Sequence, residues 1–129
     1  MSMKTLRGLG IAFLCAQTVG AFAWWCSLLI WPASRGWFMA RGAPDAVLLA
    51  FAIPDAFLFL GAAAASAFGL WSHRSWAWPL LCVHSGAAGY AALYCWCLVV
   101  LTNGDGWLGA VLMSPSLIVL PTLVWGLRP

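Results

Sequence analysis

Four apolar runs occupy most of this sequence, and each is long enough to cross a lipid bilayer. They cover residues 8–32, 46–71, 77–101 and 107–127, and a membrane-spanning helix needs about 20 such residues. Backbone N–H and C=O groups in hydrocarbon must bond within the protein, which favours helices. The connections are short, so successive helices must be antiparallel neighbours. The sequence therefore predicts an all-α membrane protein, an up-down bundle of four transmembrane helices with short connections.

The composition agrees with a bilayer as the surrounding solvent. Hydrophobic residues make up 64% of the 129 residues and charged residues 7%, against roughly 25% charged in an ordinary soluble domain. Four spans use up the chain, so we expect one transmembrane domain over residues 1–129. The net charge of +3 includes no long basic run, so nucleic acid is not an expected partner. The expected partner is the lipid bilayer itself.

The positions of the basic residues predict an orientation. Cytoplasmic connections of membrane proteins carry an excess of Lys and Arg. With both termini cytoplasmic, Arg35 and Arg41 lie outside, and the inner side holds the larger group: Lys4, Arg7, Arg74 and Arg128. Most of the ten Trp residues fall near span ends, where interfacial belts favour Trp, and we assign Trp25 to such a belt. We expect a multi-pass protein of a cell (inner) membrane.

The first span has an alternative interpretation as a signal peptide. Lys4 and Arg7 precede an apolar stretch that ends in Ala21-Phe22-Ala23, which is typical of a cleavage site. However, the apolar run continues through Trp31, a length that crosses a membrane rather than only directing export. An uncleaved first helix is favoured, and a cleaved signal peptide remains the alternative.

Ionisable groups inside the spans are few, and they are the candidate site residues. A charge at bilayer depth costs a few kcal/mol, so such groups often mark function. At about 1.5 Å per residue from the cytoplasmic ends, Gln17 and His84 both lie about 12 Å deep. Asp55 lies about 24 Å deep, between Tyr90 and Tyr94 at about 21 and 27 Å. We predict two polar layers, His84 with Gln17 and Asp55 with a tyrosine hydroxyl, as a hypothetical ligand-binding set.

Asp55 also has a purely structural interpretation. Pro54 followed by an acid is typical of a helix start, and in this interpretation the second span runs from Pro54 to Trp71 with Asp55 as a cap. Alternatively, Pro54 kinks a longer span, and the freed Ala50 carbonyl joins the Asp55 carboxyl in a local polar site. Helical phase predicts that Asp55 shares a face with small residues that pack against the third span: Ala62, Ser66 and Gly69.

His84 is interpreted first as a neutral imidazole that joins helices by hydrogen bonds. No second axial haem ligand falls at its level, and Cys95 and Cys97 point to opposite faces of a helix, which prevents chelation of one ion. We therefore predict no metal site and no cofactor. Catalysis by His84 with Asp55 is disfavoured, because their depths differ by about 12 Å and a direct proton relay needs roughly 3 Å.

Three functions remain open at this stage. The favoured one is a non-enzymatic packing or accessory subunit that associates with itself or with a larger membrane complex, since polar groups are scarce and small residues line the second and third spans. The second is a binder or transporter of a small lipophilic or cationic ligand through Asp55 with Tyr90 and Tyr94. The third is a small lipid-modifying enzyme that uses His84.

Overall fold

Four long helical segments make up the fold. The computed structural model describes residues 2–129, and within them the regular elements are all helical. The segments Met3–Ile30, Asp45–Trp71, Ala77–Leu101 and Trp107–Gly126 are each long and apolar enough to cross a membrane. They match the four predicted runs closely, although the first helix begins earlier than expected. The predicted class, an all-α four-helix membrane bundle, is confirmed, and the chain is a multi-pass membrane protein.

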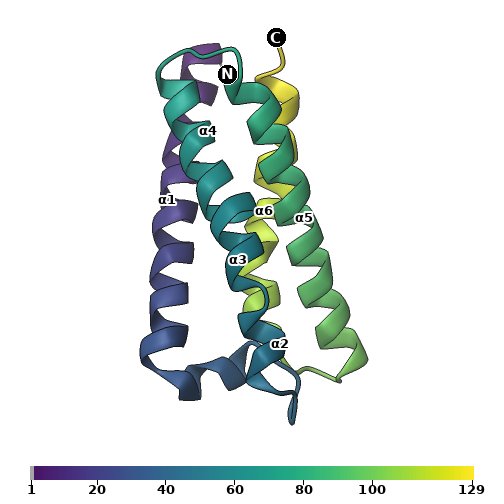
Figure 1. The fold of residues 1–129 in the computed structure, drawn as a ribbon. Helices are drawn as coiled ribbons and strands as arrows, with labels where there is room; N and C mark the ends of the chain where they lie inside the picture. The colour runs from purple at the N-terminus through teal and green to yellow at the C-terminus, as the bar shows by residue number, and fades with distance from the viewer. Residues whose placement is uncertain (1) are drawn as a thin grey trace.

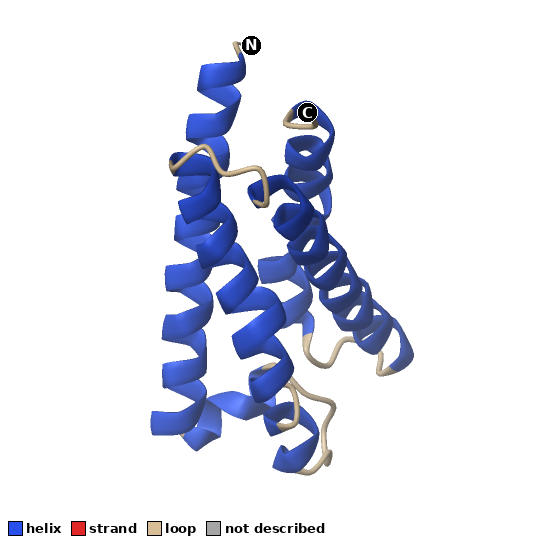
Figure 2. Cartoon of the chain, turned by 45° about the horizontal axis from the view of Figure 1, so that its top comes forward, coloured by secondary structure: helices blue, strands red, loops and turns tan. Residues whose placement is uncertain are grey.

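The spans are arranged as antiparallel neighbours (Figures 1 and 2). Helix α1 (Met3–Ile30) packs against α4 (Ala62–Trp71), α4 against α5 (Ala77–Leu101), and α5 against α6 (Trp107–Gly126). Both termini and the 72–76 connection lie at one end, which we call the terminal end. The 31–44 and 102–106 connections lie at the opposite end, which we call the loop end. The first of these connections contains a 3-10 helix, η1 (Pro32–Trp37).

The second span is interrupted close to the loop end and is π-helical near its middle. It consists of α2 (Asp45–Leu49), α3 (Ala52–Pro54), a π-helical segment η2 (Asp55–Gly61) and α4. Pro54 has no backbone N–H, so it cannot bond the carbonyl of Ala50, and the helix breaks at Ala50 and Phe51. The span is therefore the kinked one of the two predicted alternatives.

The interruption also decides the position of Asp55. Its N–H donates to the Phe51 carbonyl at 2.9 Å, so Asp55 lies inside the span and does not cap a helix that begins at Pro54. The π-helical turns that follow bring the Ala56 carbonyl to 3.0 Å from where a Cβ of Gly61 would stand. Gly61 accommodates this close approach because it has no side chain.

Small residues let the central helices approach closely. The core joins Leu14 of α1, Leu81 of α5 and Leu120 of α6, all fully buried, to a lining of alanines that α4 and α5 contribute: Ala63, Ala67, Ala77 and Ala88. Membrane helices, which gain little from apolar burial, depend on such close packing. At the terminal end, a Cβ on Gly69 would lie 2.8 Å from the Ala77 Cβ and 2.7 Å from the Trp76 ring.

A second apolar cluster and an ion pair hold the 31–44 connection at the loop end. Trp25 and Leu28 of α1 pack with Met39 and Leu48. The Arg35 guanidinium donates to the Leu28 carbonyl at 2.9 Å and to Asp45 at 2.5 Å. Because the Leu28 carbonyl lies in the last turn of α1, Arg35 satisfies an acceptor that the helix itself leaves open.

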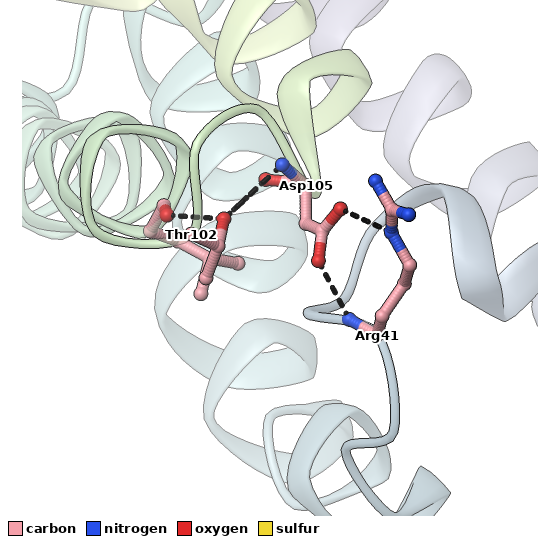
Figure 3. Close-up of polar contacts among 4 residues, drawn as sticks. Arg41, Thr102 and Asp105 are labelled. Carbon is pink, nitrogen blue, oxygen red and sulfur yellow. Dashed lines mark hydrogen bonds and ion pairs between the residues drawn. The ribbon is translucent and has the colours of Figure 1, made fainter.

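A second ion pair joins this connection to the 102–106 turn (Figure 3). The carboxylate of Asp105 accepts the Arg41 backbone N–H at 2.8 Å and its Nε–H at 3.0 Å. The Thr102 hydroxyl accepts the Asp105 N–H at 3.1 Å. The two Arg41 contacts, backbone first, hold the pKa of the Asp105 carboxyl below its usual value of 3.8.

Replacing Gly69 with alanine should destabilise the bundle. The new Cβ would overlap Trp76 and Ala77, and such overpacking typically costs about 1–3 kcal/mol. Gly86→Ala is the matched control, because a Cβ there meets nothing within 4 Å. Unfolding in mixed micelles, followed by circular dichroism, gives both values. Equal stabilities for Gly69→Ala and the wild type would contradict this packing.

The Arg41–Asp105 pair should make stability depend on pH. Since the folded carboxyl has the lowered pKa, its contribution is present above about 3.8 and is lost as pH falls through the folded value. Thermal unfolding between pH 6 and pH 2 should show this loss in the wild type and a flatter profile in Asp105→Asn. Identical profiles would mean that Asp105 ionisation does not contribute to the fold.

Candidate functional site

The largest fully buried polar side chain in the described spans is His84. It belongs to the inner face of α5, is 0% exposed, and packs edge-on against the Phe59 ring at 5.1 Å between centroids. Its Nε2 lies 3.1 Å from the Oε1 of Gln17 on α1. This is the pairing that equal depth predicts. Whether these two residues bind a ligand remains a prediction.

Each member of the Gln17–His84 pair also contacts one of the two remaining spans. Gln17 Nε2 donates to the hydroxyl of Ser116 on α6 at 2.7 Å, and His84 Nδ1 lies 3.5 Å from the Leu58 carbonyl in η2. We call Gln17, His84, Ser116 and the Leu58 carbonyl the four-span network. One member comes from each span, and the two hydrogen bonds of Gln17 fix the relative depth of α1, α5 and α6.

The donors and acceptors of the network can be assigned from its geometry. Because the Gln17 amide nitrogen donates to Ser116, its oxygen is free to accept, so His84 Nε2 carries the proton. A neutral imidazole has one N–H, and the shorter contact uses it. His84 Nδ1 is then an acceptor, so its 3.5 Å contact with the Leu58 carbonyl, which is also an acceptor, is not a hydrogen bond. The two Gln17 bonds are therefore made with a neutral His84 and without any ligand.

Asp55 has a different partner from the predicted one. Its Oδ2 accepts the indole N–H of Trp25 at 3.3 Å. Within residues 2–129 no tyrosine hydroxyl bonds to it, so the predicted Asp55–tyrosine layer is wrong. Asp55 is partly buried, and this indole is the single donor that the described chain offers its carboxylate.

The two tyrosines face outward instead. Tyr90 is 68% exposed, and Tyr94 is 39% exposed with its ring 5.5 Å from that of Phe51. The five predicted site residues therefore do not form one site. Gln17 and His84 meet in the core, while Asp55 bonds to α1 elsewhere.

The predicted common face of Asp55 and Gly69 stays a prediction, and the two residues contact different helices. Asp55 turns toward Trp25 on α1, whereas Gly69 lies against Trp76 and Ala77 at the start of α5. The prediction assumed 100° per residue throughout the span. The π-helical turns of η2 are wider than α-helical ones, so they shift the phase between the two residues.

Sequence reasoning missed two members of these contacts. Trp25 was assigned to an interfacial belt because it lies near a span end, yet it is 7% exposed and donates to Asp55. Ser116 is not among the candidate residues of the sequence analysis, yet its hydroxyl accepts from Gln17. A depth count would place Ser116 near Gln17, but depth alone does not show which face of α6 turns inward.

Two surface hollows lie away from these polar groups. A groove of about 350 Å³ runs between α1 and α4, and a hollow of about 530 Å³ lies at the loop end beside Arg41 and Asp105. Neither is lined by His84 or Asp55. No cluster of three or more metal-ligating side chains occurs in the part of the chain that the structure describes.

Comparison with known proteins adds no relative. No family model, no curated protein and no solved structure matches this chain. The fold and its interior define a class only, the small four-helix integral membrane proteins.

Removing the Gln17 side chain should destabilise the bundle. Gln17→Leu would leave the His84 N–H and the Ser116 hydroxyl without their partner, which should lower the free energy of unfolding by about 1–2 kcal/mol. Thr122→Val is the control, because that hydroxyl is exposed and bonds within its own helix.

A double-mutant cycle separates the contribution of the Gln17–Ser116 hydrogen bond from the effect of changing the shape of the Gln17 side chain. Combining Gln17→Leu with Ser116→Ala should reveal a coupling of about 0.5–1.5 kcal/mol in unfolding free energy. Strict additivity of the two single changes would show that the Gln17–Ser116 bond does not stabilise the protein.

Proposed function

We propose that this protein is a non-enzymatic packing or accessory subunit that associates with itself or with a larger membrane complex through α1. The observation that carries the proposal is a row of small, exposed residues on α1, which we call the α1 stripe: Ala16, Gly20, Ala23 and Ser27. A Cβ built on Gly20 meets nothing within 4 Å. The stripe is therefore open along its length.

Small residues spaced in this way favour helix–helix contact in membranes. Positions 16, 20, 23 and 27 follow the spacing of one helical face, and Ala16 with Gly20 forms a small-xxx-small pair. Such faces let two backbones approach closely, which supplies the van der Waals contact that drives association in lipid. Within the bundle this spacing is already used on α4, whereas on α1 it faces outward.

The interior polar groups support the same function. His84 is fully buried, so a lipid substrate cannot reach its imidazole. Its N–H is already bonded to Gln17 and is not available for transfer to a substrate. The enzyme hypothesis is weaker for this reason. The ligand hypothesis keeps one favourable observation, the partly buried Asp55 carboxylate with a single indole donor. The ligand hypothesis also required Tyr90 and Tyr94 to lie beside Asp55, whereas both tyrosines face outward.

The proposal includes an orientation with both termini cytoplasmic, in a cell (inner) membrane. Four basic residues belong to the terminal end, and the two at the loop end are paired with Asp45 and Asp105. An excess of Lys and Arg is typical of the cytoplasmic side.

Gly20→Leu should weaken association. A leucine side chain would hold two backbones apart at the α1 stripe, and we expect about ten-fold weaker self-association or co-purification of a complex, equivalent to about 1.4 kcal/mol. Gly86→Leu on α5 is the matched control, because it also adds a side chain in open space. Energy transfer between labelled copies in vesicles and affinity purification from native membranes provide the two measurements.

Two outcomes would contradict the proposal. The first is a strictly monomeric wild type with no cross-linked neighbour in native membranes. The second is equal association of Gly20→Leu, Gly86→Leu and the wild type.

A further inference from the structure

The two ends of the bundle differ in how their charges are balanced. At the loop end, Arg35 pairs with Asp45 and Arg41 with Asp105. The third acidic residue, Asp55, lies within a span. At the terminal end, within residues 2–129, four basic side chains have no carboxylate partner: Lys4, Arg7, Arg74 and Arg128. An anion from outside the chain would neutralise the positive charge at this end.

An apolar groove leads from this end along the bundle surface. It lies between α1 and α4, has a volume of about 350 Å³, and is lined chiefly by Ile11, Cys15, Thr18, Ala64, Phe68 and Trp71. The one hydroxyl, that of Thr18, already donates to the Leu14 carbonyl at 2.8 Å. Two aromatic rings on α4 stand exposed at its edge. A groove of this shape and polarity fits a hydrocarbon chain.

Arg7 lies where the groove meets the charged end. It precedes Ile11 by one turn on the same face of α1. Its Nη1 is 2.6 Å from Nδ1 of His73, which follows Trp71 in the connection that runs beside the start of α1 (Figure 1). The Arg7–His73 contact thus lies just beyond Ile11 and Trp71, the lining residues nearest the terminal end. An imidazole that accepts this bond offers no negative charge, and the guanidinium keeps further donors free.

We propose that this groove binds one anionic phospholipid, with its phosphate held by Arg7, Lys4 and Arg74 and one acyl chain lying between α1 and α4. Guanidinium groups bind phosphate through paired, charge-assisted hydrogen bonds. Basic clusters beside membrane spans attract anionic headgroups by about 1 kcal/mol per residue. A second copy of this chain is a poorer occupant, because symmetric pairing would bring like charges together.

Lipid titration of the purified full-length chain in neutral detergent tests the proposal. Trp fluorescence and native mass spectrometry should show one bound phosphatidylglycerol, with phosphatidylcholine and inorganic phosphate each at least about five-fold weaker. Arg7→Gln and Arg74→Gln should each weaken phosphatidylglycerol binding about five-fold. Arg128→Gln is the matched control: it removes the same charge at the same end, but from α6, where Arg128 lies 4.2 Å from the Trp125 ring centroid.

A second variant tests the groove apart from the charges. Ala64 is exposed on the groove wall, so Ala64→Leu should fill the groove, weaken lipid binding and leave the core unchanged. Gly20→Leu should leave lipid binding intact, since the proposal does not rest on the α1 stripe. An equal loss in Arg128→Gln would overturn the site in favour of diffuse attraction. If inorganic phosphate bound as tightly as phosphatidylglycerol, the proposal that the ligand is a lipid would be overturned. If Cys15–Cys15 cross-links formed and prevented lipid binding, the groove would instead be a contact with a second copy of the chain.

Discussion

The hydrogen bonds of one glutamine link three of the four spans and set their relative positions. Each helix is apolar on nearly all sides, so the hydrophobic effect alone does not select a rotation or a depth within a bilayer. Gln17 removes this freedom, because its amide bonds both His84 and Ser116 while His84 approaches the Leu58 carbonyl. Directional bonds of this kind specify register where apolar packing does not. The surrounding alanines then permit the close approach that the bonds require.

The few charged residues of this chain are distributed differently between the two ends of the bundle. Two of the three acidic residues lie at the loop end, where Asp45 and Asp105 bind the arginines of the long first connection. These ion pairs hold a connection that contains little regular structure. The terminal end needs no such support, since the 72–76 connection is short and the left-handed His73 ends α4 compactly. Its basic residues remain available to interact with the membrane surface.

Much of this fold is predictable from sequence, and the limits have physical causes. Four apolar runs set the spans, and depth counted along regular helices paired Gln17 with His84. The Asp55–tyrosine layer was wrong for another reason: a depth count does not show which face of a helix turns inward, and Tyr90 and Tyr94 face outward while Trp25 bonds to Asp55. Trp25 was missed because the inward face of a helix that is apolar all round cannot be identified from sequence. Which side chain bonds to Asp55 depends on the rotation of each helix about its axis.

Helix α1 illustrates how one uniformly apolar span can serve several contacts. At 100° per residue, Gly10 and Leu14 face the core, Ile11 and Cys15 face the groove beside α4, and Gly20 faces away from both. A lipid in the groove and a partner helix on the α1 stripe would therefore not compete for the same surface. Because Gln17 lies on the same helix and holds its rotation, all three faces depend on that residue. Loss of the four-span network should thus disturb both outer surfaces together, whereas a change on either surface should leave the other intact.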